Sequence, residues 1–179
     1  MKISLEDAIN EQYNILLLER FINVFDKKEL ETYIDDIWNI MQLSYAPIGG
    51  FLSAKNKADL IQKVAFAKMV RKDNKIVAVS LYKDAHGKKR IASGTDGTSI
   101  GKLALRQILR EDVKFDRSWG EVSGAMEHIM KKEGAVPYPN TLAAELLQRE
   151  IVSLNPDGFH YTRMIQGEPH EKIIFGSIK

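Results

Sequence analysis

The chain contains no cysteine, and this absence removes several kinds of chemistry at once. Disulfide bonds, thiolate metal sites and a cysteine nucleophile are excluded, because each of them needs a thiol. No apolar run is long enough to cross a bilayer, and the first residues include acidic side chains where a signal peptide would be apolar. We therefore expect a cytoplasmic protein that has no membrane partner.

A large excess of charge of one sign is also missing, since 26 Lys and Arg residues face 24 Asp and Glu residues, for a net charge of +2. Charges of both signs are mixed along most of the chain, so the composition does not require a nucleic-acid partner. Repeats, low-complexity tracts and Pro/Gly/Ser-rich linkers are absent as well. At 179 residues the sequence is long enough for one packed domain.

The first third of the sequence has the spacing of helices. Ser4, followed by acidic residues, fits an N-cap, and apolar residues recur from Ile15 through Phe25. We expect a second helix over 27–46 and a short third helix over 57–64. The apolar face of the second helix holds Leu30, Ile34, Ile37, Trp38 and Met41.

After position 64 the pattern changes to that of strands. Apolar-rich runs at 65–72 and 75–83 are separated by Asp73-Asn74, a strong turn signal, and a third run follows at 90–94. A glycine-rich turn then leads into a further helix. The rest of the chain predicts a strand at 118–124, helices at 125–134 and 140–154, and a hairpin of 159–166 and 171–178 around Gly167 to His170.

The glycine-rich turn, SGTDGTSIGK, is the candidate ligand site. Small residues permit close approach to the backbone, and free N–H groups at a helix N-terminus, from about Thr98 to Lys102, can face an anion. A P-loop is excluded because Leu103 stands where the Mg²⁺-binding hydroxyl belongs, and the Rossmann glycine spacing is absent. The alternative is an ordinary strand-to-helix turn in which Thr98 or Ser99 is the N-cap.

The segment DGTSIGKLAL resembles the acetyl-CoA pyrophosphate loop of the GNAT N-acyltransferase family, whose pattern is Gln/Arg-x-x-Gly-x-Gly/Ala. Gly101 matches the last glycine, Ser99 replaces the first, and Asp96 replaces the Gln/Arg. An acidic side chain beside a pyrophosphate is unfavourable unless it points away. The resemblance implies that acetyl-CoA or another acyl-CoA is the cofactor. Its binding residues would be Ser93, Gly94, Gly97, Thr98, Ser99, Gly101 and Lys102.

The order of the expected elements resembles the same family from about Leu30 to the end of the chain. The resemblance implies an α/β (α+β) fold, with a central, mostly antiparallel mixed sheet flanked by helices. We expect this domain over 27–179, preceded by an N-terminal helical extension over 1–26. The family normally begins with a strand, so the extra helix departs from its pattern. Some phage and mobile-element proteins resemble this layout and keep a degenerate loop.

The segment SGAMEHIMKKEGA resembles the family's segment after the fifth strand. Gly134 takes the glycine place, and Met130 stands where many members carry a general-acid tyrosine. The usual proton donor to the CoA thiolate is therefore absent. A member without this tyrosine uses another donor, does different chemistry or does not catalyse.

Acyl transfer to an amine needs a base and an oxyanion donor. The resemblance implies that the thioester lies between the fourth and fifth strands, where N–H groups near Ser93 or Gly94 can polarise its carbonyl. Glu121 is the first choice of base, and its alternative is a solvent-facing strand glutamate. Ser123 and Tyr138 are further candidate catalytic residues, although Tyr138 equally fits a packing residue in a turn.

Polar and aromatic residues gather in the expected C-terminal hairpin. His160, Tyr161 and Arg163 are candidate substrate-binding residues, and His170 is close to them in the sequence. Strand alternation places Tyr161 and Arg163 on one face and His160 on the other. The same cluster also fits a polar exposed face. No His/Asp/Glu spacing indicates a metal site.

The sequence leaves three functions open. The first is acyl-CoA-dependent N-acyl transfer to an unidentified amine acceptor, which is a small molecule or a macromolecule. The second is a non-catalytic GNAT-like binding module, which the missing tyrosine and the acidic loop residue favour. The third is nucleic-acid binding or modification, with HGKKR at 86–90, Arg117 and Trp119 as a contact strip. The alternative for HGKKR is a solvated hairpin tip.

Overall fold

The computed structural model describes residues 5, 21–24, 26–51, 53–85, 88–115, 118–122, 125–132, 135–137, 151–154, 160–165 and 167–176. The chain divides into two compact units. The first unit comprises 1–83 and 92–108, and the second comprises 84–91 and 109–179. The boundaries fall before the last residue of strand β3 (Lys75–Asp84), inside strand β4 (Lys88–Thr95) and inside helix α4 (Ser99–Phe115), so each of these elements contributes to both units.

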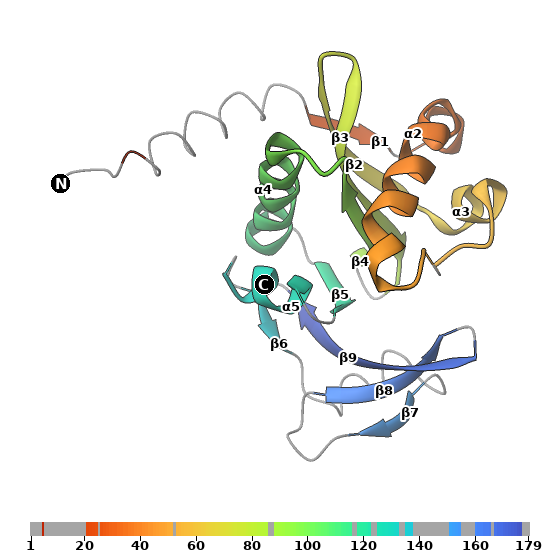
Figure 1. The fold of residues 1–179 in the computed structure, drawn as a ribbon, viewed down its shortest axis with the longest axis vertical. Coiled ribbons are helices and arrows are strands. Elements are labelled where there is room, and N and C mark those ends of the chain that lie inside the picture. The colour runs from red at the N-terminus through yellow and green to blue at the C-terminus, as the bar shows by residue number, and fades with distance from the viewer. Residues whose placement is uncertain are drawn as a thin grey trace. The chain divides into compact units, whose positions relative to one another are not determined.

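The first unit is built on consecutive neighbouring strands, which Figure 1 shows with helices on both sides. These strands are β1 (Phe21–Val24), β2 (Phe66–Lys72), β3 (Lys75–Asp84) and the second half of β4. The β1–β2 and β2–β3 pairs are antiparallel. Asp73 and Asn74 join β2 to β3 with φ angles of 49° and 62°, a left-handed conformation that Asp and Asn tolerate better than other side chains. The predicted turn is therefore confirmed.

Three helical segments precede β2 in the first unit. They are α2 (Lys27–Tyr45), the short 3-10 helix η1 (Ala46–Ile48) and α3 (Lys57–Lys63). Asp26 caps α2 by accepting from the amide of Lys28 at 2.9 Å. Asn56 caps α3 by accepting from the amide of Asp59 at 2.8 Å, while the Asp59 carboxylate accepts from the amide of Lys55. Both helices that the sequence predicted here are confirmed.

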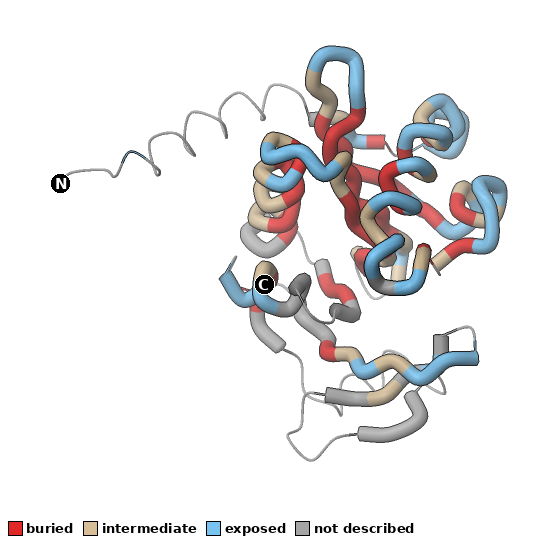
Figure 2. The backbone as a smooth tube through the Cα atoms, viewed as in Figure 1, coloured by how far each residue is buried: buried red, intermediate tan, exposed pale blue. Residues whose placement is uncertain are grey.

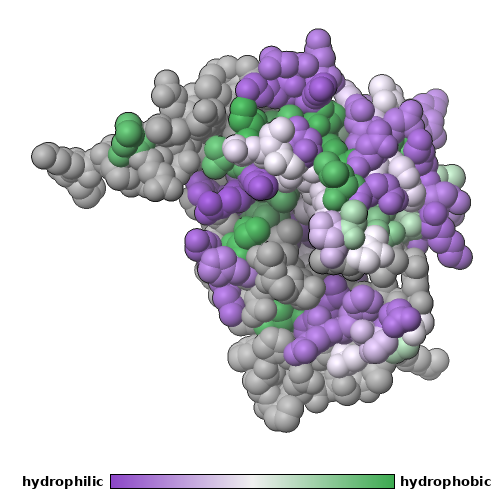
Figure 3. Space-filling model, in the orientation of Figure 1, coloured by the Kyte–Doolittle hydropathy of each residue, from purple (hydrophilic) through white to green (hydrophobic). Residues whose placement is uncertain are grey.

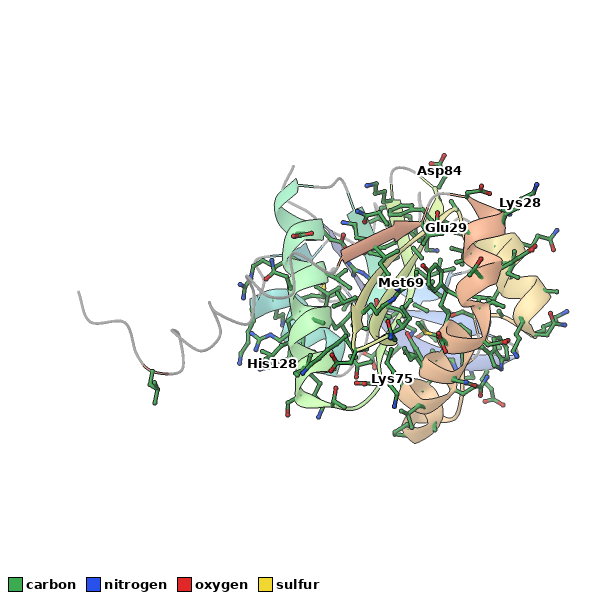
Figure 4. All side chains as sticks on the ribbon, turned by 90° about the horizontal axis from the view of Figure 1, so that it is seen from above. Lys28, Glu29, Met69, Lys75, Asp84 and His128 are labelled. Carbon is green, nitrogen blue, oxygen red and sulfur yellow. The ribbon has the colours of Figure 1, made fainter. Side chains whose placement is uncertain are left out.

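The core of the first unit lies between this sheet and its helices (Figure 2). Strand β3 is buried without interruption from Ile76 to Tyr82, because both faces of the sheet are covered. Met69 of β2 is fully buried at the centre of the sheet, whereas Lys75 lies at the exposed turn (Figure 4). The rings of Phe66 and Tyr82 stack with centroids 4.5 Å apart. Two-sided burial explains why the β3 sequence is a continuous apolar run.

The second unit contains the first half of β4 and the last part of α4, followed by the rest of the described chain. Its other elements are β5 (Ser118–Val122), α5 (Ala125–Lys132), β6 (Val136–Pro137), β7 (Ile151–Leu154), β8 (His160–Ile165) and β9 (Glu168–Gly176). The strand order is β4-β5-β9-β8-β7, and β6 also pairs with β9. The β4–β5 pair is parallel, and the pairs from β5 onward are antiparallel. None of the helices among the described residues is long and apolar enough to span a membrane.

Two expectations about the elements are wrong. Residues 21–24 form strand β1 where the apolar spacing indicated the end of a helix, so the chain does have an early strand as the GNAT pattern requires. Residues 151–154 form β7 where a helix was expected, because the β-branched Ile151 and Val152 favour a strand when β8 offers a pairing edge. Of the predicted N-terminal helix the structure describes only Leu5 and residues 21–24, and of the predicted helix over 140–154 it describes only residues 151–154. The domain boundary at residue 26 stays a prediction.

A buried ion pair joins β4 to α4 within the second unit. Nη2 of Arg90 donates to Oδ2 of Asp112 at 3.1 Å, and the two side chains are 5% and 0% exposed. Nη1 of Arg90 also donates to Sδ of Met130 in α5 at 3.6 Å. Removing a charge from water costs several kcal/mol, and a buried partner of opposite charge offsets that cost. Each of these two charges therefore depends on the other.

We expect Asp112→Ala to lower the free energy of unfolding by about 3–5 kcal/mol, because it leaves the Arg90 guanidinium buried without its carboxylate. Urea unfolding followed by circular dichroism measures the change. Asp35→Ala is the matched control, because Asp35 pairs with Lys57 at 2.8 Å but is 79% exposed. This control should leave stability unchanged within error. A small loss of similar size in both variants would contradict the importance of the buried pair.

Candidate functional site

The turn between β4 and α4 is closed by hydrogen bonds within the chain. The amide of Gly97 donates to Oγ1 of Thr95 at 3.1 Å. Both the amide and the hydroxyl of Thr98 donate to Oδ1 of Asp96, at 3.0 and 2.5 Å. The amide of Gly101 donates to Oγ1 of Thr98 at 3.0 Å. Thr98 is therefore the N-cap of α4, which is the ordinary strand-to-helix turn that the sequence left open as an alternative.

The expectation of free amides from Thr98 to Lys102 is wrong for three of these residues. Thr98 and Gly101 donate to side chains of the turn, and the amide of Lys102 donates to the carbonyl of Thr98 at 3.0 Å. Within the part of the chain that the structure describes, the amides of Ser99 and Ile100 have no partner. The physical reason is Asp96, because a short carboxylate reaches the N–H group two residues ahead, as in an Asx turn.

Gly101 has a packing reason of its own. A Cβ at this position would overlap the carboxylate of Asp96 and would lie 2.7 Å from the carbonyl oxygen of Val77. The amide of Asp96 donates to the same Val77 carbonyl at 3.0 Å, which holds the turn against β3. The space beside this glycine, which the resemblance implied for a pyrophosphate, is therefore occupied by Asp96. Gly97 is needed for a different reason, since its φ angle of 84° is left-handed.

The end of α2 makes hydrogen bonds to the second half of β4. Oγ of Ser44 accepts from the amide of Thr95 and donates to the carbonyl of Thr95, both at 3.0 Å. The amide of Ser93 donates to the hydroxyl of Tyr45 at 3.2 Å. A Cβ on Gly94 would lie 2.6 Å from Oγ of Ser44. Side chains of α2 thus bind the backbone of β4 beyond Arg90, where the described pairing with β5 has ended.

This contact changes the role expected for Ser93. Its amide, one of the two near Ser93 and Gly94 that were expected to polarise a thioester carbonyl, donates to Tyr45, and its hydroxyl shares a 2.9 Å hydrogen bond with the buried Ser80. Sequence reasoning missed Ser44 and Tyr45, which precede their β4 partners by 51 and 48 positions. The only local signal was Gly94, whose missing side chain lets α2 approach closely.

The candidate catalytic residues lie in the second unit. Glu121 stands in β5 directly opposite Ile174 of β9, and its role as a base stays a prediction. Ser123 and Tyr138 lie outside the described residues. Met130, at the place of the general-acid tyrosine, is 1% exposed and accepts a hydrogen bond from Arg90 through a thioether that has no proton to give. His128 is exposed on α5, as expected for a helix surface (Figure 4).

The expected nucleic-acid contact strip is wrong for three of its residues, whereas Lys88 is half-buried. Lys89, Arg90 and Trp119 are buried, at 6%, 7% and 3% exposure. Nζ of Lys89 lies 4.9 Å from the ring centroid of Trp119, and Nε1 of Trp119 donates to the carbonyl of Ala85 at 2.8 Å. A solvated tip is also wrong for Lys89 and Arg90, because β4 begins earlier than expected and draws both residues into the sheet. His86 and Arg117 lie outside the described residues.

The predicted C-terminal hairpin is confirmed. Ile165 lies opposite Glu168, so the chain turns at Gly167, and Glu168 to His170 belong to β9 instead of the turn. Arg163 lies opposite His170, and His160 lies opposite Ile173. By strand alternation, Tyr161 and Arg163 share a face from which His160 is excluded, as the sequence predicted.

Solved structures of known proteins resemble this architecture. The ribosomal-protein-S18-alanine N-acetyltransferase from Escherichia coli aligns with a TM-score of 0.53 and 11% identity, over 88% of this chain and 92% of that one. The chain has a GNAT-type fold. An IAA acetyltransferase from Bacillus cereus ATCC 14579 aligns with a TM-score of 0.46 and 8% identity, over 88% of this chain and 98% of that one. No protein-family model and no curated protein sequence matches the chain.

We expect Gly101→Ala to lower the free energy of unfolding by about 1–3 kcal/mol, because the added methyl group meets the Asp96 carboxylate and the Val77 carbonyl. Urea unfolding measures the loss. Lys102→Ala is the matched control, because this neighbouring helical residue is exposed and alanine is also a good helix former. If both variants are as stable as the parent chain, the space beside Gly101 is open and the closed turn is wrong.

Proposed function

We propose that this chain is a GNAT-type binding module that does not transfer an acyl group. The proposal is carried by the closed turn at the start of α4, where Asp96 and Thr98 accept hydrogen bonds from amides that a diphosphate would need. A carboxylate in this position fills the space beside Gly101 and also repels a second anion. The residues present therefore do not fit the diphosphate of an acyl-CoA.

Two further observations support the absence of acyl transfer. The amide of Ser93 donates to Tyr45, so it does not provide the oxyanion donor that thioester chemistry requires. Met130 replaces the general-acid tyrosine with a buried thioether that accepts from Arg90. Each of these groups is thus engaged in the structure of the protein itself.

An acyl-CoA-dependent N-acyltransferase is the second candidate. It is favoured by the likeness of the fold to an N-acetyltransferase, and by the Ser99 and Ile100 amides, which have no partner within the described residues. Its cofactor would be acetyl-CoA or another acyl-CoA, Lys102 would add positive charge near the diphosphate, and its acceptor would be an amine. Nucleic-acid modification has no comparable support, because Lys89, Arg90 and Trp119 of its contact strip are buried.

We expect no heat of binding when acetyl-CoA is titrated into the full chain, and no rise in its melting temperature. A ligand at one hundred times its dissociation constant stabilises a protein by about 2.7 kcal/mol, so binding would be visible as a clear thermal shift. The E. coli N-acetyltransferase named above serves as the positive control for both measurements.

The same titration also tests the second candidate. A thermal shift with acetyl-CoA, together with release of free thiol in the presence of a mixture of amines, would overturn the binding-module proposal and establish acyl transfer. A thermal shift without thiol release would still contradict the closed turn, because it would show that the diphosphate displaces Asp96.

A further inference from the structure

A basic face of the C-terminal hairpin has no part in the function proposed above. Arg163 lies directly opposite His170 in the β8–β9 register, and Tyr161 lies directly opposite Lys172. Because successive strand residues alternate between faces, these four positions stand on one face of the hairpin. We propose that this basic face, defined as Tyr161, Arg163, His170 and Lys172, binds a single phosphate group of the protein's ligand.

The register places an arginine and a histidine directly opposite each other. Directly opposite residues in an antiparallel pair have Cβ atoms about 4.5–5.5 Å apart. Arg163 and His170 occupy such a pair, and Lys172 follows on the same face. An arginine fork matches two oxygens of a phosphate, and a histidine ring N–H can donate to a third.

His170 supplies a second, independent observation. Its Nε2 atom is buried and has no hydrogen-bond partner within the described residues. A buried polar group without a partner destabilises the folded chain, and a hydrogen bond to an oxygen of a ligand removes that penalty. Phosphate oxygens are acceptors for the donors that histidine, arginine and tyrosine provide. The unpartnered nitrogen and the Arg163–His170 pair therefore indicate the same class of ligand.

Carboxylates near the basic face limit the size of the ligand. Glu168 ends the face at the turn, opposite Ile165, and Glu121 of β5 stands opposite Ile174, two positions beyond Lys172. Figure 3 shows hydrophilic residues along the surface of the described part of β9. A polyanion lying along the strands would meet both carboxylates, whereas one phosphate group over Arg163 and His170 lies between them. The arrangement therefore favours a single phosphate over a nucleic-acid backbone.

Titration of the full chain with inorganic phosphate, at constant pH in a zwitterionic buffer, tests the proposal. We expect saturable shifts of the amide resonances of Glu168 and of residues 170–172, with the largest shift at His170. Arg163→Gln should weaken the affinity at least tenfold. The matched control is Met164→Gln, which changes an exposed residue of the same strand on the opposite face and should leave the affinity unchanged. Thermal unfolding of both variants confirms that they are folded.

Two other anions complete the experiment. Tighter binding of inorganic phosphate than of dimethyl phosphate assigns a terminal phosphate, and the reverse order assigns a phosphodiester; either result supports the proposal. Equally tight binding of acetate, an unchanged affinity in Arg163→Gln, or no saturable shift at Glu168 and 170–172 overturns it. Shifts at Thr98 and Gly101 instead report an anion at the α4 turn, which contradicts the closed turn and not the basic face.

Discussion

The hydrogen bonds that the Asp96 carboxylate accepts from Thr98 determine what the start of α4 can do. A helix N-terminus attracts anions because its first amides lack partners and its dipole is positive there. In this chain the anion is covalently part of the turn, so it is present at a fixed position without any loss of translational freedom. Gly101 then serves the protein's own carboxylate, because only glycine leaves room for it. The helix N-terminus thus still attracts an anion, but the anion that it holds is the protein's own Asp96 carboxylate.

Side chains at the end of α2 likewise form hydrogen bonds with backbone groups of β4 that a ligand could otherwise bind. Ser44 binds both the amide and the carbonyl of Thr95, and Tyr45 accepts from Ser93, so side chains complete the hydrogen bonding of this strand segment. Backbone groups that are satisfied in this way gain little from an external ligand, because binding would first have to break existing bonds. These two contacts therefore engage the backbone of Ser93 and Thr95 within the protein itself.

The sequence predicted the parts of the fold that depend on local patterns. The Asp73-Asn74 turn, the α2 and α3 helices and the C-terminal hairpin all follow from short-range spacing and turn chemistry. Strand β7 was missed because its four residues continue an apolar spacing that also fits a helix, and only its pairing with β8 decides between them. The closed turn was one of the two alternatives that the sequence left open, but the contacts of α2 with β4 were not predictable, since Ser44 and Tyr45 reach β4 from about 50 positions earlier in the chain.

The division of the chain has a practical consequence for anyone who wishes to study its parts. The backbone passes from the first unit to the second at residue 84, returns at 92, and leaves again at 109. No single truncation therefore yields either unit intact, and a fragment ending in β4 or α4 would expose half of a strand or a helix. Isolated units would require a rearranged gene, in which the segments of one unit are rejoined by new loops, as in circular permutation.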